Sequence, residues 1–221
     1  MSAVTEAIVR EYFEQRGFMV HQQRKYVSTI LRDEEEMDFL VFNPKPLKRE
    51  TPLPFILGAQ DVACIERAVV EVKGSHTGTY SPARLNEEPE MFRFLEPAIF
   101  KQAAKFFGDG STVSKILIIP ALPHDETMRQ QSLDLLRAKG LDAIIPFGSL
   151  LADLVTTTEP NRNYQKSDVL QVIRLLKNYD LLRESQMELF KQPQRKPVPP
   201  VRRKATQPPP SAAPATPPAE S

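Results

Sequence analysis

The chain has few of the residues that build several common functional sites. Its 221 residues include one cysteine, Cys64, which excludes an internal disulfide and a Cys-x-x-Cys metal site. Three histidines, none at His-x-x-x-His spacing, argue against a zinc hydrolase. The eight glycines form neither G-x-G-x-x-G nor G-x-x-x-x-G-K-[ST], so the loops that cradle nucleotide phosphates are not encoded.

Long hydrophobic runs are missing as well. No apolar stretch approaches about 18 residues, the length that a membrane-spanning helix needs. The first residues, MSAVTEAIVREYF, lack the layout of a signal peptide. We therefore expect a protein without a membrane partner, located in the cytoplasm.

Proline and charge are distributed unevenly. Ten of the 21 prolines follow Gln192. Of the 29 basic and 28 acidic residues, six basic and one acidic lie in residues 191–221, which leaves 23 basic and 27 acidic before them. The first part therefore has a net charge of −4 and the second +5. We predict one domain over residues 1–190 and a disordered, proline-rich basic tail over residues 191–221.

Hydrophobic spacing predicts alternating helices and strands in the first part. The expected order is a helix at 3–16, a strand and turn region over 18–23 and 24–30, strands at 37–42 and 66–74, a helix at 88–107 that Pro97 should start or kink, a strand at 114–122, a helix at 125–139, a strand at 141–147 and a helix at 167–183. This order predicts an α/β sandwich, with a central mixed sheet flanked by helices.

The segment ERAVVEVKGSH contains the only acid-x-lysine triplet of the chain, Glu71-Val72-Lys73. Side chains at positions i and i+2 of a strand share a face, so Glu71 and Lys73 emerge together while Val70 and Val72 point to the opposite layer. An isolated triplet of this kind is usually an exposed ion pair. Here it lies on one of the most apolar strands of the chain, where a solvated face is less expected.

Two further acids are candidates for the same site. Asp38 begins the preceding strand, where an antiparallel pairing would bring its carboxylate beside Glu71. Glu6 lies on the first helix, eleven residues before Gly17. Crowded carboxylates on an apolar strand are unfavourable without a cation, so they indicate a site for a hard divalent metal. Such a metal, together with a lysine, is suited to hydrolysis of a phosphodiester.

These residues resemble the PD-(D/E)xK nuclease superfamily, which has a restriction-endonuclease-like three-layer sandwich. The resemblance covers residue 3 to about residue 147: a helix with an acid, a strand that opens with an acid, a strand that ends in VVEVKG, then a helix and a strand. The stretch TEAIVREYFEQRGFMV is similar to the first helix of archaeal Holliday-junction resolvases. KQAAKFF, with Gln102, is similar to the QxxxY element of helicase-associated exonuclease domains.

The resemblance implies a deoxyribonuclease that uses Mg²⁺ or Mn²⁺, with DNA as its partner. Asp38, Glu71 and the Val72 carbonyl would hold the metal, Glu6 would reach it through water, and Lys73 would be the catalytic lysine. By the same resemblance, Gln102 and Lys105 would contact DNA phosphate or bridge to the metal. Apart from the resemblance, Ser75 and His76 follow the lysine in a polar loop, where they could donate hydrogen bonds to phosphate. A two-fold homodimer is common among such enzymes, because two strands need two sites.

Some alternatives stay open. Asp61, ten residues before Glu71, competes with Asp38, although FLVF makes the better strand. Glu11 competes with Glu6, and five positions place them on different sides of a helix. The tail could attract nucleic-acid phosphates, or it could offer its prolines to the aromatic groove of a partner protein. In the latter case the chain would be a non-catalytic module of the same fold that recruits partners.

Overall fold

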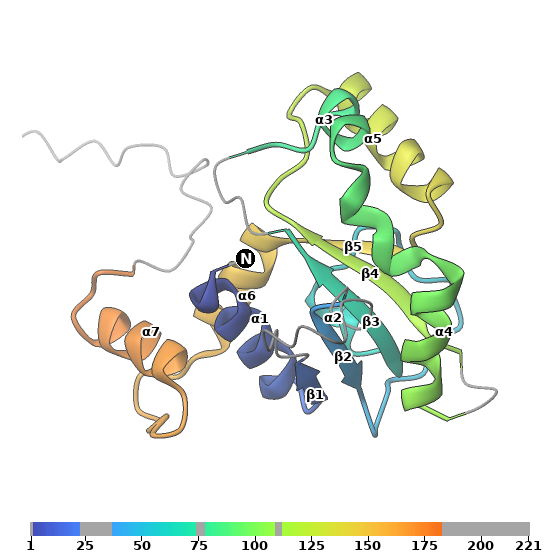
Figure 1. Ribbon diagram of the computed structural model, residues 1–221. Helices are drawn as coiled ribbons and strands as arrows, with labels where there is room; N and C mark the ends of the chain where they lie inside the picture. Colours follow the sequence, from blue (N-terminus) through green and yellow to red (C-terminus); the bar gives the residue numbers. More distant parts are fainter. Residues whose placement is uncertain (1, 23–36, 74–77, 109–111, 183–221) are drawn as a thin grey trace, which may run out of the picture. The chain divides into compact units, whose positions relative to one another are not determined.

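Five strands form one mixed sheet in the computed structural model, which describes residues 2–22, 37–73, 78–108 and 112–182 (Figure 1). The strands lie side by side in chain order: β1 (Met19–Gln22), β2 (Phe39–Phe42), β3 (Arg67–Val72), β4 (Ser114–Ile119) and β5 (Ala143–Pro146). β1, β2 and β3 pair antiparallel, whereas β3, β4 and β5 pair parallel. The predicted α/β class with a mixed sheet is confirmed.

Capping side chains mark the starts of several of the described helices. They are α1 (Ala3–Gln15), α2 (Ala59–Val62), α3 (Pro82–Glu87), the 3₁₀ helix η1 (Pro89–Leu95), α4 (Pro97–Phe106), α5 (Glu126–Ala138), α6 (Phe147–Thr157) and α7 (Asp168–Asn178). Ser2, Asp125 and Ser167 precede α1, α5 and α7, and each side chain accepts a hydrogen bond from a backbone N–H of the first turn. Such caps satisfy donors that the helix itself leaves unpaired.

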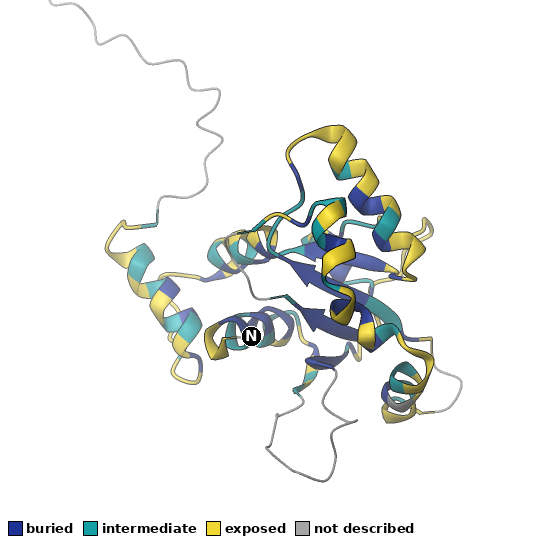
Figure 2. Ribbon diagram, turned by 45° about the horizontal axis from the view of Figure 1, so that its top comes forward, coloured by how far each residue is buried: buried dark blue, intermediate teal, exposed yellow. Residues whose placement is uncertain are grey.

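Hydrophobic cores lie on both faces of the sheet. On one face, Val70 and Val72 pack with residues of α1, α6 and α7; on the other, Val69 and Leu117 pack with residues of α3, η1, α4 and α5. Figure 1 shows α1 and α6 on one side of the strands and α3 to α5 on the other, and the central strands are mostly dark blue in Figure 2. Burial on both faces explains the continuous apolar runs of the central strands.

Two boundaries differ from the sequence expectation. The helix expected at 88–107 is divided: Pro97, which has no backbone N–H, begins α4 after the 3₁₀ turns of η1. Helix α6 was not expected, because it begins directly after β5 with Pro146 at its N-cap and no capping side chain. The segment 24–30 and the tail 191–221 lie outside the described residues, so the predictions for them remain predictions.

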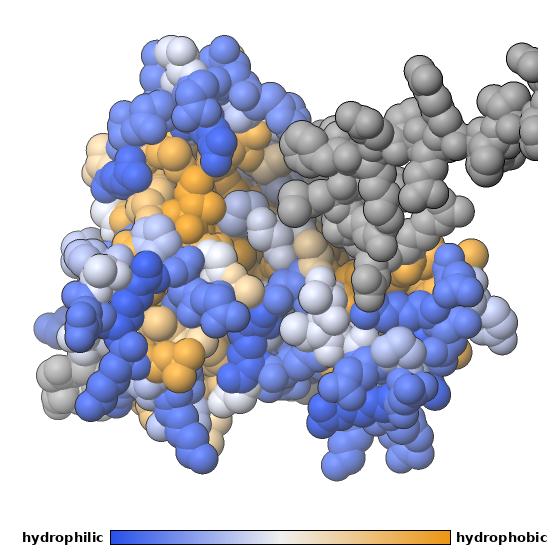
Figure 3. Space-filling view, turned by 180° about the vertical axis from the view of Figure 1, so that it is seen from behind, coloured by the Kyte–Doolittle hydropathy of each residue, from blue (hydrophilic) through white to orange (hydrophobic). Residues whose placement is uncertain are grey.

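Large hydrophobic side chains also remain on the surface. Seen from behind, hydrophobic patches lie among hydrophilic side chains (Figure 3). Among the exposed ones, Met19 on β1 is 64% exposed and Phe106 at the end of α4 is 58% exposed. These two residues border a pocket that is described below.

Candidate active site

The C-terminal end of β3 carries the acid-x-lysine triplet. Antiparallel pairing places Phe39 of β2 opposite Val70 of β3, so that Asp38 falls one step further, beside Glu71. Asp38 lies just before β2 rather than within it. Its Oδ2 accepts a hydrogen bond of 2.8 Å from the backbone N–H of Val72. The Asp38 carboxylate thus stands where the next carbonyl of the β2–β3 ladder would be.

Glu71 and Lys73 form an ion pair beside this ladder end. The Lys73 ammonium Nζ donates to Glu71 Oε1 at 2.7 Å. The Lys73 backbone N–H donates to the Ile118 carbonyl at 2.9 Å, which holds the lysine against β4 beyond the last residue of β3. Hydrogen bonds to Asp38 before β2 and to Ile118 of β4 therefore hold the backbone that follows Glu71. The Glu71 and Lys73 side chains lie on the same face of the sheet, as the alternation of a strand predicts.

The site is more buried than a surface ion pair. Asp38 and Glu71 are only 7% and 9% exposed, whereas the Lys73 side chain is 24% exposed. Glu71 shares the face of Val69, which α3, η1 and α5 cover. Ionised groups at such depth are stabilised only by partners or a cation, because desolvation disfavours the charged form. The lysine is thus the part of the triplet that reaches solvent.

Glu6 has a different partner. Its Oε2 accepts a hydrogen bond of 2.6 Å from Gln22 Nε2, which ties α1 to the edge strand β1. Within the described residues, no three or more His, Cys, Asp or Glu side chains gather closely enough to hold a metal ion. Asp38 and Glu71 lie at one ladder end, and Glu6 does not join them in a cluster of three acids.

The two rival acids have roles of their own. Asp61 lies in α2, where its carboxylate accepts from the Gly58 backbone N–H at 2.9 Å and pairs with Arg49. Glu11 is only 7% exposed, and burial raises the pKa of its carboxyl, while a hydrogen bond with the Ser167 side chain lowers it. The Glu11 side chain on α1 therefore meets the start of α7. Neither Asp61 nor Glu11 contacts the β3 triplet through a described hydrogen bond.

The expected phosphate-binding residues are only partly described. Gln102 and Lys105 both lie on α4, and the Lys105 side chain is exposed. Ser75 and His76 lie outside the described residues. The role expected for these four residues therefore stays a prediction.

A polar cluster of Tyr80, Arg84 and Glu88 was not anticipated from the sequence. Where the described chain resumes after Lys73, Tyr80 N–H donates to the Ala121 carbonyl at 2.9 Å. Glu88 accepts from Arg84 Nε at 2.9 Å and from the Tyr80 hydroxyl at 3.3 Å, and the Arg84 guanidinium lies 4.5 Å from the Tyr80 ring centroid. Burial, with Glu88 nearby, raises the pKa of Tyr80. The four-residue spacing of Arg84 and Glu88 was the available signal.

Comparison of the chain with protein-family models, curated proteins and solved structures found no match in any of the three. None of the described helices is long and apolar enough to cross a membrane.

Proposed function

We propose that this chain is a metal-dependent nuclease that hydrolyses DNA phosphodiester bonds on a restriction-endonuclease-like scaffold. One observation carries the proposal. The acid Asp38 meets the backbone of Val72, at the ladder end where Glu71 and Lys73 emerge together. The elements that form this part of the sheet follow in the order of one helix, three antiparallel strands and then strands that pair parallel. Both the residues and their order agree with the resemblance to the PD-(D/E)xK superfamily.

The donor set suits a hard divalent cation. Asp38 and Glu71 are carboxylates, and Val72 offers a carbonyl between Glu71 and Lys73. Mg²⁺ prefers oxygen ligands and is usually bound through one or two carboxylates together with waters and substrate phosphates. Two acids therefore suffice, and a third acid is not needed in direct contact. When bound, the metal would neutralise phosphate charge and stabilise the leaving oxygen.

The protein's own residues have separable parts in the reaction. A water oxygen forms a bond to phosphorus and the bond from phosphorus to the 3′ oxygen breaks, while the water gives up a proton to solvent and the leaving 3′ oxygen takes one up from solvent. Lys73, partly exposed and held by Glu71, is the group that would orient the attacking water and offset the charge of the transition state. Glu71 orients that ammonium through the 2.7 Å contact, so the acid both offers oxygen to the metal and positions the lysine.

The test is incubation of the purified protein with supercoiled, linear, single-stranded and branched DNA in Mg²⁺, Mn²⁺ or EDTA. We expect cleavage that requires the metal and that falls by about 100-fold or more in Glu71→Gln and Lys73→Ala. Matched controls are Glu126→Gln, whose side chain is 82% exposed, and the exposed Lys139→Ala, which should keep the wild-type rate. Cleavage that persists in both site variants, or no cleavage by folded wild type on any substrate, would contradict the proposal.

A further inference from the structure

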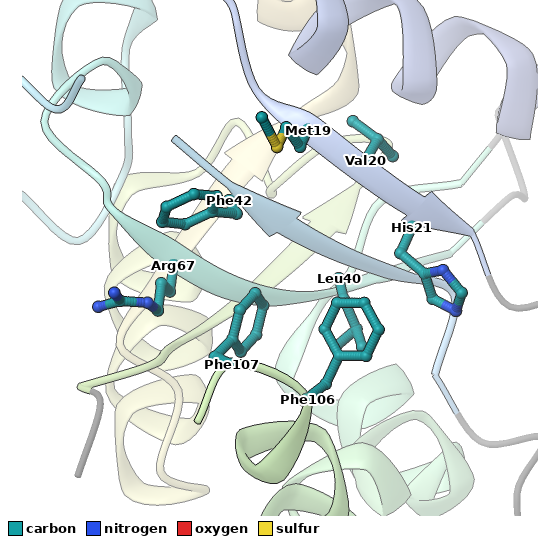
Figure 4. Close-up of a pocket in the computed structure, with 8 residues that line it drawn as sticks. All are labelled: Met19, Val20, His21, Leu40, Phe42, Arg67, Phe106 and Phe107. Carbon is teal, nitrogen blue, oxygen red and sulfur yellow. The ribbon is translucent and has the colours of Figure 1, made fainter. Parts of the chain in front are cut away.

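A pocket of about 350 Å³ lies between the antiparallel strands and the end of α4 (Figure 4). Strands β1, β2 and β3 form one wall, and the last residues of α4 with its C-cap form the other. Its lining residues are Met19, Val20, His21, Leu40, Phe42, Arg67, Phe106 and Phe107. A volume of this size is within the range of small-ligand sites.

The strand register relates this pocket to the acid pair. Leu40 pairs with His21 on one side and with Val69 on the other, while Phe42 faces Arg67. Positions 38, 40 and 42 share one face of β2, as do positions 67, 69 and 71 on β3. The row of Leu40 is two residues from the row of Asp38 and Glu71, a separation of about 7 Å along the strands. The pocket and the candidate active site therefore lie on the same face of the sheet.

Flat aromatic surfaces surround the hollow. The rings of His21 and Phe106 have centroids 4.9 Å apart with a tilt of 32°, and Phe107 meets Phe106 edge to face at 5.6 Å. Figure 4 shows these rings and Phe42 around the hollow, with Leu40 among them. Phe106 is 58% exposed, although its ring is apolar. Exposed ring faces beside a concave surface suit a planar ligand that stacks on them.

The charges at the pocket favour an anionic ligand. Of the residues that line the pocket, Arg67 carries a positive charge and none is acidic. The exposed Lys105 directly precedes Phe106 on α4. Arg67 pairs with Glu66 at 2.7 Å, but the Glu66 side chain is 49% exposed, so a phosphate could replace it at little expense. A planar base joined to a phosphate combines both requirements.

We infer that this pocket binds an unpaired base of the DNA substrate, so that the preferred substrate has single-stranded nucleotides next to the bond that is cleaved. The inference rests on the proposed function, since it names the substrate class of the same site. An intact duplex keeps its bases stacked, and a base must leave the stack before it can enter a pocket. A single strand or an overhang needs no such step.

Binding in EDTA tests this without cleavage. The probe is a fluorescently labelled 12-nucleotide single strand, compared by anisotropy with the blunt duplex of the same sequence. We expect the single strand to bind more tightly, and Phe106→Ala to weaken that binding by about 5-fold or more. Phe106→Trp should retain affinity because it keeps a stacking face, whereas Phe106→Leu should not. The matched control is Tyr179→Ala, which removes an aromatic ring that is 74% exposed and lies outside the pocket.

The outcomes separate this inference from the proposed function. Equal binding of strand and duplex, or affinity unchanged in Phe106→Ala, would overturn it even if the protein cleaves DNA. Full retention of single-strand affinity in Phe106→Leu would overturn it too, because leucine is hydrophobic but has no ring on which a base can stack. The expected binding pattern without any metal-dependent cleavage would support base binding in the pocket and contradict the proposed nuclease activity.

Discussion

Asp38 and Val72, 34 residues apart in the chain, are joined by a hydrogen bond of 2.8 Å from the Val72 backbone N–H to Asp38 Oδ2. The bond is buried, and it extends the pairing of β2 and β3 beyond the last backbone pair, Phe39 with Val70. Asp38 therefore has a structural role at the ladder end in addition to any role in metal binding. The two roles can be separated by substitution.

Asp38→Ala should lower the free energy of unfolding by about 1–3 kcal/mol, because it leaves the buried Val72 N–H without this acceptor. Asp38→Asn keeps an amide oxygen at the same place and should be destabilised less, while it loses the charge that a cation needs. Urea unfolding at neutral pH measures both variants. Equal destabilisation of the two would show that the hydrogen bond contributes little. If the nuclease proposal holds, both variants should lose cleavage.

Divalent metal should stabilise the folded protein. A ligand that binds only the folded state at 100 times its dissociation constant adds about 2.7 kcal/mol to the free energy of unfolding. We expect the melting temperature to rise with Mg²⁺ or Mn²⁺ in the wild type and in Glu126→Gln, and to stay unchanged in Asp38→Asn and Glu71→Gln. A rise of the same size in all four proteins would place the bound metal elsewhere.

Gly78 should tolerate a side chain only if Arg84 moves. A Cβ at position 78 would collide with the Arg84 guanidinium, which lies over the Tyr80 ring and donates to Glu88. Gly78→Ala should therefore lower the free energy of unfolding by about 1 kcal/mol, the usual scale of one partly exposed ion pair and one cation–π contact. Thermal or urea unfolding measures the change.

The double variant provides the control for that prediction. In an Arg84→Ala background the Gly78→Ala substitution should have almost no further effect, because the atom that it displaces is gone. Strictly additive losses in the double variant would show that Gly78 is required for another reason.

Glu11→Gln should stabilise the protein at neutral pH. Burial raises the pKa of Glu11 above its ordinary value of 4.5, so the folded state binds the proton more tightly than the unfolded chain does. The contribution of the Glu11 carboxyl to stability is fully present below pH 4.5 and is lost as the pH rises through its raised pKa in the folded state. Above that value the wild type carries a buried charge that glutamine lacks.

The measurement is the melting temperature of both proteins between pH 4 and pH 7. The advantage of Glu11→Gln should be largest at pH 7 and should shrink toward pH 4. The exposed Glu126→Gln serves as the comparison and should show no such trend. A Glu11→Gln protein that is less stable than wild type at pH 7 would mean that its hydrogen bond with Ser167 outweighs the desolvation.

Local sequence patterns were sufficient for much of the fold. The break at Pro97 was predicted, because proline acts on the backbone within a few residues of itself. The caps Ser2, Asp125 and Ser167 act over the same short range. Helix α6 was not predicted, because Pro146 at its N-cap supplies no side-chain hydrogen bond that would mark its start.

The candidate site divides in the same way. That Glu71 and Lys73 share a face follows from the alternation of any strand, and the sequence was enough to predict it. Which acid joins them depends on pairing between distant segments: Asp38 meets Val72 through the β2–β3 register, Glu6 bonds to Gln22, and Asp61 caps α2. The pocket likewise exists only because the end of α4 packs against β1 and β2. Such contacts arise from the packing of whole elements, which no local pattern of residues encodes.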